Sequence, residues 1–69
     1  MRGYLKNMRE NKGMTQQDVA GQLGISYQYY SLIENGDRQK NMDITLAAKI
    51  AAVFGVEIGE IVRLEKEVL

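Results

Sequence analysis

The stretch Thr15-Gln-Gln-Asp-Val-Ala-Gly-Gln-Leu-Gly-Ile-Ser-Tyr-Gln-Tyr-Tyr-Ser-Leu-Ile-Glu-Asn-Gly36 has the pattern of two short helices joined by a tight turn. The small side chain of Ala20 lets a second helix cross close to the first, and Gly24 can adopt the positive φ that a sharp reversal between helices requires. The sequence therefore predicts a helix-turn-helix in the first half of the chain.

Helix signals continue on both sides of this stretch, without the alternation typical of a strand. The Thr15 hydroxyl, with Asp18 three residues on, predicts a capped helix start. We predict five helices, which cover about Arg2 to Asn11, Thr15 to the turn at Gly24, Ser26 to Asn35, Asp43 to Gly55, and roughly Ile58 to Val68. Because no Pro or low-complexity tract interrupts them, residues 1–69 are expected to form a single domain.

One face of each predicted helix should contribute to the core. The second helix is expected to bury Val19, Ala20 and Leu23, and the fourth to bury Ile44, Ala47, Ala48, Ala51 and Phe54. Tyr29 and Tyr30, in the third helix, are expected to pack rather than to bind a ligand.

The composition leaves little chemistry for catalysis. The 69 residues include no Cys and no His, which removes the commonest metal ligands, nucleophiles and proton shuttles. A chain this short buries only roughly 60% of the surface that its unfolded form exposes, so a large substrate cavity is not expected. We therefore expect no enzyme, no cofactor and no metal site. No apolar run approaches the length of a membrane span, which favours a cytoplasmic protein.

The charges are balanced overall but unevenly distributed. Nine basic residues match nine acidic ones, whereas a nucleic-acid-binding protein usually has a basic excess. Residues 1–40 hold six basic and four acidic side chains, and residues 41–69 hold three basic and five acidic ones. The basic half contains the predicted helix-turn-helix.

Four segments, in this order and spacing, together resemble the phage-repressor and Cro type of helix-turn-helix domain, also called the xenobiotic-response-element family. They are Leu5–Gln16, Leu23–Ser26, Ile33–Gly36 and Ile50–Val56. The resemblance covers about residues 4–62 and leaves 63–69 as a C-terminal helical extension. It implies a compact, all-α, lambda-repressor-like fold of five helices, and a homodimer that binds a palindromic DNA operator and regulates transcription, with repression favoured.

The predicted third helix supplies the candidate base-reading residues. At 100° per residue, one outward arc contains Tyr27, Gln28, Ser31 and Leu32. The Gln28 amide suits a bidentate contact to adenine, Ser31 can bond a base edge or a phosphate, and Tyr27 can contact a thymine methyl or a phosphate. Leu32 either reads a thymine methyl or marks a surface for another protein. No residue from 26 to 33 is charged, although relatives commonly carry Arg or Lys there.

The resemblance also implies phosphate contacts and an internal ion pair. Gln16 matches a side chain that bonds a phosphate at the positive end of the second helix, and Arg38 and Lys40 follow the third helix, where family members track the DNA backbone. The alternative is that all three are ordinary solvated side chains. Arg9 and Glu34 match a pair that joins the first helix to the end of the third, against the alternative of two surface charges.

The last predicted helix carries more apolar surface than one core requires. Measured from Ile61, its apolar residues span about 160°, wider than the roughly 100° stripe that seats a helix. We expect Leu64, Val68 and Leu69 to contact a second copy, and the alternative is that they fold back on the first helix or fray. Glu65 lies inside the same arc, which requires a place at its rim or a partner across the interface.

Together these observations favour a DNA-binding transcriptional regulator that acts as a homodimer on double-stranded DNA, in the cytoplasm and associated with the nucleoid, with no small-molecule effector domain in this chain. The alternative within the same fold is a protein-interaction module of the antitoxin-like or adaptor kind. Binding to duplex DNA that weakens as salt rises distinguishes the first from the second.

Overall fold

A computed structural model describes residues 1–68 of the chain. These residues form five helices, joined by loops, at the positions expected from the sequence. They are α1 (Gly3–Asn11), α2 (Gln16–Leu23), α3 (Tyr27–Asn35), α4 (Ile44–Phe54) and α5 (Ile58–Val68). No strand occurs within these residues, and the all-α prediction is confirmed. None of the helices between residues 1 and 68 is long and apolar enough to cross a membrane.

Side-chain caps begin α2, α3 and α4. The Thr15 hydroxyl accepts a hydrogen bond from the Asp18 amide at 3.1 Å, and the Asp18 carboxylate accepts one from the Thr15 amide at 2.9 Å. Ser26 and Asp43 accept in the same way from the backbone amides of Tyr29 and Leu46, at 3.1 and 2.7 Å. Each cap satisfies an amide that has no partner inside its helix, so local sequence sets these three helix starts.

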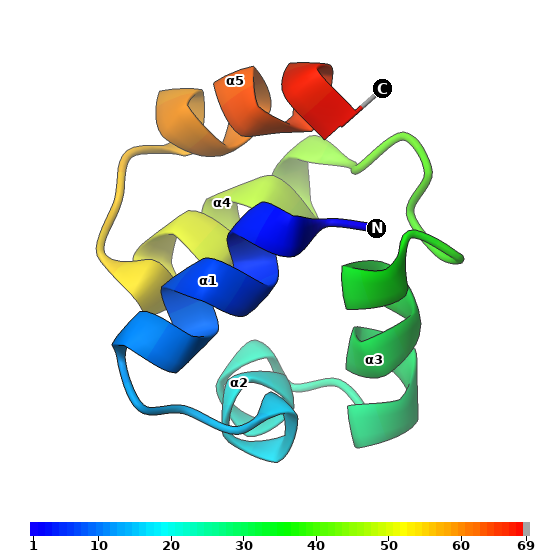
Figure 1. Cartoon of the computed structure of the whole chain (residues 1–69), viewed down its shortest axis with the longest axis vertical. Helices are drawn as coiled ribbons and strands as arrows, with labels where there is room; N and C mark the ends of the chain where they lie inside the picture. The colour runs from blue at the N-terminus through cyan, green and yellow to red at the C-terminus, as the bar shows by residue number, and fades with distance from the viewer. Residues whose placement is uncertain (69) are drawn as a thin grey trace.

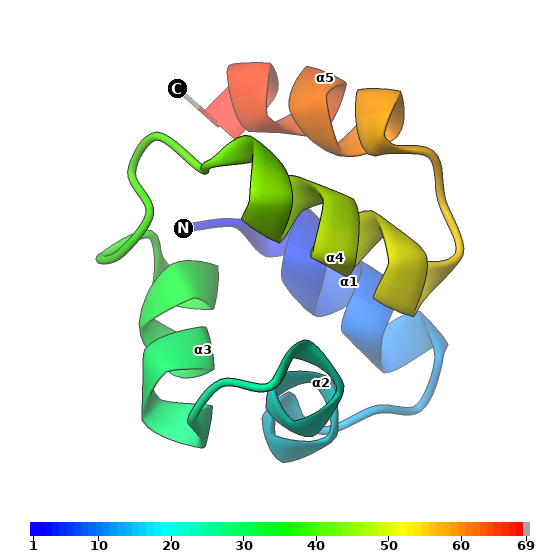
Figure 2. The same ribbon diagram turned by 180° about the vertical axis from the view of Figure 1, so that it is seen from behind.

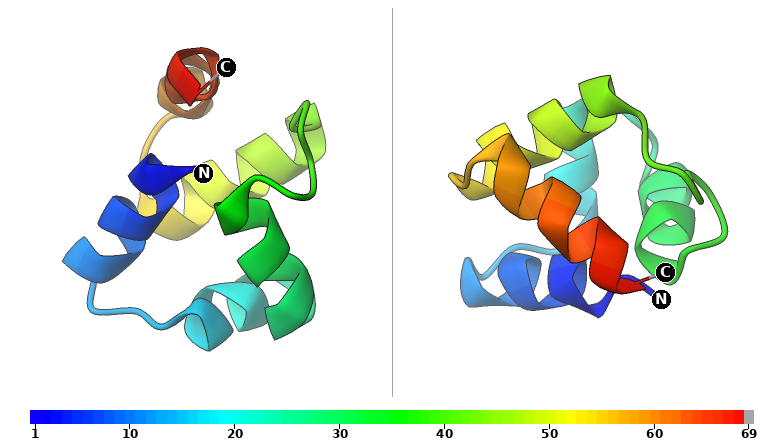
Figure 3. Two further views of the ribbon diagram at one scale, coloured as in Figure 1. Left: turned by 45° about the vertical axis from the view of Figure 1, so that its right-hand side comes forward. Right: turned by 90° about the horizontal axis from the view of Figure 1, so that it is seen from above.

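The helices enclose one core (Figure 1). In Figure 1, α1 lies in front of α4, and Figure 2 shows α4 from the other side. At one end of the molecule α5 lies across α1 and α4, as the view from above in Figure 3 shows. At the other end, α2 is seen nearly end-on while α3 stands upright beside it. The helix-turn-helix therefore lies on the side of the molecule away from α5.

The buried core contains Leu5, Val19, Ala20, Leu23, Tyr30, Ile33, Leu46, Ala47, Ile50, Ala51, Phe54 and Ile61. The predicted inward face of α2 is confirmed. For α4 the prediction was wrong at two positions, because Ile44 is 67% exposed and Ala48 is also exposed. The helix is turned so that Leu46, Ala47, Ile50, Ala51 and Phe54 share the buried face, and this rotation leaves Ile44 and Ala48 outside the core.

Two glycines near each other in α2 and its cap lead to opposite predictions. Gly24 ends the helix with φ 73°, in the left-handed region, whereas Gly21 lies inside the helix, where an added Cβ would meet nothing within 4 Å. We expect Gly24→Ala to lower the free energy of unfolding by about 1 kcal/mol, and Gly21→Ala to raise it by about 1 kcal/mol. Urea denaturation of both variants measures the difference. Effects of the same sign would show that backbone conformation is not what Gly24 provides.

Candidate nucleic-acid interface

The first turn of α3 presents polar side chains to solvent. Tyr27 is 44% exposed and Gln28 is exposed, while Ser31 and Leu32 are half-buried one turn later. Tyr30, on the opposite side of α3, is fully buried, as expected of a core residue. The structure thus places the four candidate base-reading residues on the side of α3 that faces away from the core.

The start of α2 adjoins this surface of α3. Tyr27 lines an open hollow of about 500 Å³ together with Arg9, Met14, Thr15, Gln16 and Gln17. Gln16, the first residue of α2, is half-buried, and its side-chain amide donates a hydrogen bond to Glu34 Oε1 at 3.2 Å. This bond orients Gln16 at the hollow, beside the amino end of α2, where the helix dipole favours an anion.

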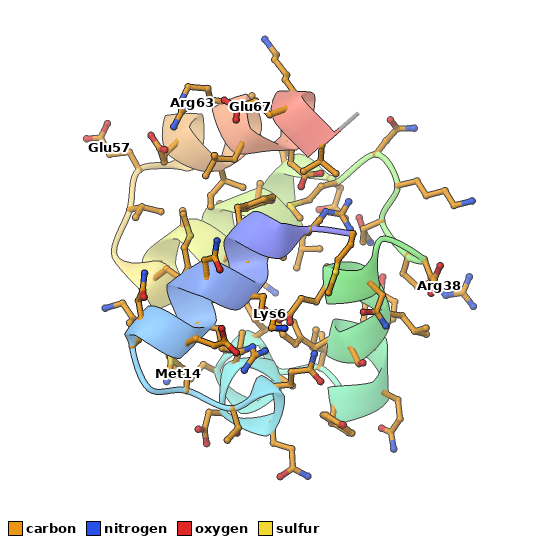
Figure 4. The ribbon with its side chains drawn as sticks, in the orientation of Figure 1. Lys6, Met14, Arg38, Glu57, Arg63 and Glu67 are labelled. Atoms are coloured by element: carbon orange, nitrogen blue, oxygen red, sulfur yellow. The ribbon has the colours of Figure 1, made fainter. Side chains whose placement is uncertain are left out.

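The loop between α3 and α4 carries two exposed cations. Figure 4 shows the side chain of Arg38 pointing away from the helices, and Lys40 is also exposed. Between them, Gln39 has φ 55°, which is uncommon for a residue other than glycine. The side-chain amide of Gln39 donates to the Tyr29 hydroxyl at 2.8 Å, and its side-chain oxygen accepts from the Asp43 amide at 3.2 Å. The loop is therefore tied to α3 on one side and to the start of α4 on the other.

Arg9 of α1 and Glu34 of α3 form a two-pronged ion pair. Arg9 Nε lies 3.0 Å from Glu34 Oε2, and Arg9 Nη2 lies 3.0 Å from Glu34 Oε1. The two side chains are only 12% and 2% exposed, so they are not surface charges. Burial raises the pKa of the Glu34 carboxyl, but hydrogen bonds from Arg9 and Gln16 outweigh this effect and hold the pKa below its usual value. The carboxylate therefore stays charged and binds α1 and α2 to the end of α3.

The hydroxyl of Tyr30 lies in the same enclosed region. It is buried and makes no hydrogen bond of normal geometry with the residues described. Burial and the nearby charge of Glu34 raise the pKa of Tyr30, which keeps the phenol neutral. Tyr30 therefore contributes its ring to the core and no charge to the interface.

A second buried cluster was not anticipated from the sequence. Arg2, just before α1, is 2% exposed and pairs with Glu65 of α5, Nε to Oε2 at 2.7 Å and Nη2 to Oε1 at 3.0 Å. The Tyr4 hydroxyl donates to the same carboxylate, and burial together with this bond raises the pKa of Tyr4. The carboxylate of Glu65 is thus paired with a cation of its own chain. The signal in the sequence was a carboxylate on the apolar side of a helix, which requires a buried partner.

The residues expected at a dimer contact differ in their exposure to solvent. Leu64 is half-buried, Val68 is 39% exposed, and Leu69 lies outside the described residues. Further exposed apolar surface lies between α4 and α5, where Ile44 and the 39% exposed Val62 line a hollow of about 240 Å³. The apolar surface open to a partner is therefore centred closer to Val62 than to Leu64.

Comparison with known proteins identifies the family. The Helix-turn-helix family model matches residues 5–61, which include most of α1, the whole of α2, α3 and α4, and the start of α5. The chain belongs to this family of DNA-binding transcriptional regulators, and the predicted resemblance to the phage-repressor and Cro type is confirmed.

Individual relatives are regulators of similar length. The chain is 39% identical over 57 residues to the uncharacterized HTH-type transcriptional regulator YqaF of Bacillus subtilis, covering 83% of this chain and 72% of that protein. It is 41% identical over 61 residues to an uncharacterized HTH-type transcriptional regulator of Methanocaldococcus jannaschii, covering 88% and 89%. It is 37% identical over 65 residues to the control protein C.MunI of a Mycoplasma species, covering 91% and 85%. No solved structure matches the chain significantly.

The enclosed Arg9–Glu34 pair leads to a stability prediction. We expect Arg9→Ala to lower the free energy of unfolding by roughly 3 kcal/mol, because Glu34 would remain buried without its cation. Thermal denaturation at neutral pH measures this loss. Arg63→Ala is the matched control, since Arg63 pairs only with the exposed Glu60 and Glu67, and its Tm should stay close to that of the parent protein. An unchanged Tm in Arg9→Ala would show that the pair behaves like two surface charges.

Proposed function

We propose that this protein is a homodimeric repressor that binds a palindromic operator in double-stranded DNA. The observation that carries the proposal is the uncharged outer side of α3, with Tyr27 and Gln28 exposed, beside the first turn of α2. A helix-turn-helix docks by placing its second helix in the major groove while the first helix meets the backbone. One relative, C.MunI, is described as a control protein, which agrees with a regulatory role.

Base reading is assigned to the outward side of α3. Gln28 has a donor and an acceptor at its tip, which suits N6 and N7 of adenine. Tyr27 and Ser31 lie on the same side and can reach a thymine methyl, a base edge or a phosphate, and Leu32 suits a thymine methyl. Because none of these side chains is charged, discrimination would come from amide and hydroxyl hydrogen bonds and apolar contacts, not from pairing of Arg with guanine.

Phosphate contacts are assigned to side chains at both ends of α3. Gln16 shares an open hollow with Tyr27 at the start of α3, and Arg38 and Lys40 lie exposed in the loop that follows its end. This placement lets the protein contact the DNA backbone on both sides of the groove that α3 would enter. Such contacts carry no sequence information, but they set the register and orientation of the reading helix.

A second copy is proposed to pack against α5. Leu64, Val68 and Leu69 were expected at this contact, and the exposed Ile44 and Val62 extend the apolar surface toward α4. A two-fold dimer would bring two copies of α3 to successive turns of the major groove, about 34 Å apart. Two such half-site contacts give a domain this small a route to useful operator affinity.

Gln28→Ala tests base reading. On the duplex that the protein selects from a random pool, the variant should lose roughly 1–3 kcal/mol of binding free energy, and on random duplex much less. Fluorescence anisotropy across a salt series measures both losses, and Gln22→Ala, an exposed glutamine of α2 outside the arc, is the control. Equal losses on the two duplexes would refute base reading. A parent protein that binds no duplex even at low salt would favour a protein-interaction module instead.

The double substitution Ile44→Gln and Val62→Gln tests the dimer. Both side chains are exposed in the single chain, so the fold should persist while the dimer weakens by about tenfold or more, ~1.4 kcal/mol. Analytical ultracentrifugation measures the dimerisation constant, and Thr45→Gln, an exposed neighbour on α4, is the control. A parent chain that stays monomeric at high micromolar concentration would contradict the proposed dimer.

A further inference from the structure

The guanidinium of Arg2 joins parts of the chain that are far apart in sequence. Two of its nitrogens hold the Glu65 carboxylate of α5. Its Nη1 also donates to the carbonyls of Ile33, at 2.6 Å, and Arg38, at 3.0 Å, and its Nη2 donates to the carbonyl of Gln39. These five hydrogen bonds match the five N–H groups of a guanidinium. Arg2 is therefore fully engaged inside the protein.

The carbonyls that Arg2 binds belong to the end of α3 and to the loop after it. Ile33 lies in the last turn of α3, where its carbonyl also accepts a hydrogen bond from the Gly36 amide at 3.1 Å and where a positive charge is favourable. Arg38 and Gln39 lie in the loop after α3, and the left-handed conformation of Gln39 is one that a residue with a side chain seldom adopts. The bonds from Arg2 to the loop backbone, together with those of the Gln39 side chain to Tyr29 and Asp43, hold the loop in a conformation that its own backbone preference would not select.

We propose that Arg2 and Glu65 are positioning residues for the loop of residues 37–42, so that α5 raises DNA affinity through this loop and independently of dimerisation. The inference rests on the proposed phosphate contacts of Arg38 and Lys40. Arg2 itself does not reach DNA, because it is 2% exposed and its donors are occupied.

The role of Glu65 follows from the cost of an unpaired buried charge. Without the carboxylate, Arg2 would be a buried cation bonded only to neutral carbonyls, and such a cation moves toward water. Its departure would release the carbonyls of Arg38 and Gln39. A loop freed in this way samples more conformations and must be ordered again when it binds phosphate, which lowers the affinity.

Glu65→Gln and Glu67→Gln form a matched pair, since each removes one negative charge from α5. Glu67 pairs with the exposed Arg63 on the outer side of α5 (Figure 4). Through charge alone, both substitutions should strengthen binding to DNA. The proposal predicts that Glu65→Gln weakens binding to random duplex by roughly tenfold. The slope of the logarithm of the binding constant against the logarithm of the salt concentration should also become less negative by about one to two, because each phosphate that the loop no longer neutralises accounts for ~0.9. The DNA affinities of both variants and of the parent protein are compared at a protein concentration at which sedimentation shows the same oligomeric state for all three.

Hydrogen exchange of the unbound protein gives a readout that does not depend on DNA. The amides of Asp37 and Arg38 donate to the Leu32 carbonyl of α3, and the Asp43 amide donates to the Gln39 side chain. These three amides should exchange faster in Glu65→Gln and in Arg2→Met than in the parent protein. Amides of α2 and α4 should keep their rates, whereas a general loss of stability would speed exchange everywhere. Lys6→Met, which removes an exposed cation of α1, is the control for Arg2→Met.

Arg38→Ala and Lys40→Ala separate the possible failures. If both keep the affinity and salt dependence of the parent protein, the loop does not contact phosphate, and its proposed function and this inference are both wrong. If they weaken binding while Glu65→Gln binds random duplex as tightly as the parent protein, whatever its exchange rates, only the positioning role of Arg2 and Glu65 is wrong. The positioning role is supported if Glu65→Gln binds DNA more weakly and its loop amides exchange hydrogen faster, while Glu67→Gln shows neither change.

Discussion

The buried carboxylate of Glu34 fixes α3, the helix assigned to base reading, against the rest of the molecule. It accepts two hydrogen bonds from Arg9 of α1 and one from Gln16 of α2, and the backbone carbonyl of the same residue accepts from the Arg2 amide at 2.8 Å. A core this small has little apolar area to orient three helices, and hydrogen bonds to a charge impose direction as well as distance. The position of α3 relative to α1 and α2 therefore depends on this side chain as well as on the apolar packing of Tyr30 and Ile33 in the core.

Six of the nine acidic side chains are engaged in ion pairs or helix caps, whereas Glu10, Asp37 and Glu57 are exposed, so the net charge of zero only partly reflects the surface that a polyanion would meet. Glu34 and Glu65 lie in enclosed pairs, Asp18 and Asp43 cap helices, and Glu60 and Glu67 pair with Arg63 on α5, away from the helix-turn-helix. Arg38 and Lys40, by contrast, make no ion pair with the residues described and face solvent. The total charge of a small domain is thus a poor guide to its surface, because carboxylates engaged inside the fold repel phosphate less than exposed ones.

The sequence by itself determined the features that depend on neighbours within one helical turn. Thr15, Ser26 and Asp43 mark the helix starts because their side chains bond amides three residues away, and Gly24 marks the turn because a left-handed residue ends α2 there. The outward side of α3 also followed from helical periodicity alone. Arg9 and Glu34, 25 positions apart, could be paired only through the resemblance to a family.

Only the tertiary structure decided which surfaces meet. Periodicity placed Ile44 and Ala48 on the inner face of α4, but the rotation of that helix is set by how Leu46 and Ile50 fit the neighbouring helices. The pairing of Arg2 with Glu65 joins residues 63 positions apart, and no local pattern specifies such a distance. The same holds for the loop after α3, whose conformation depends on a guanidinium from the opposite end of the domain. Buried charges find their partners through packing, and packing is a property of the whole chain.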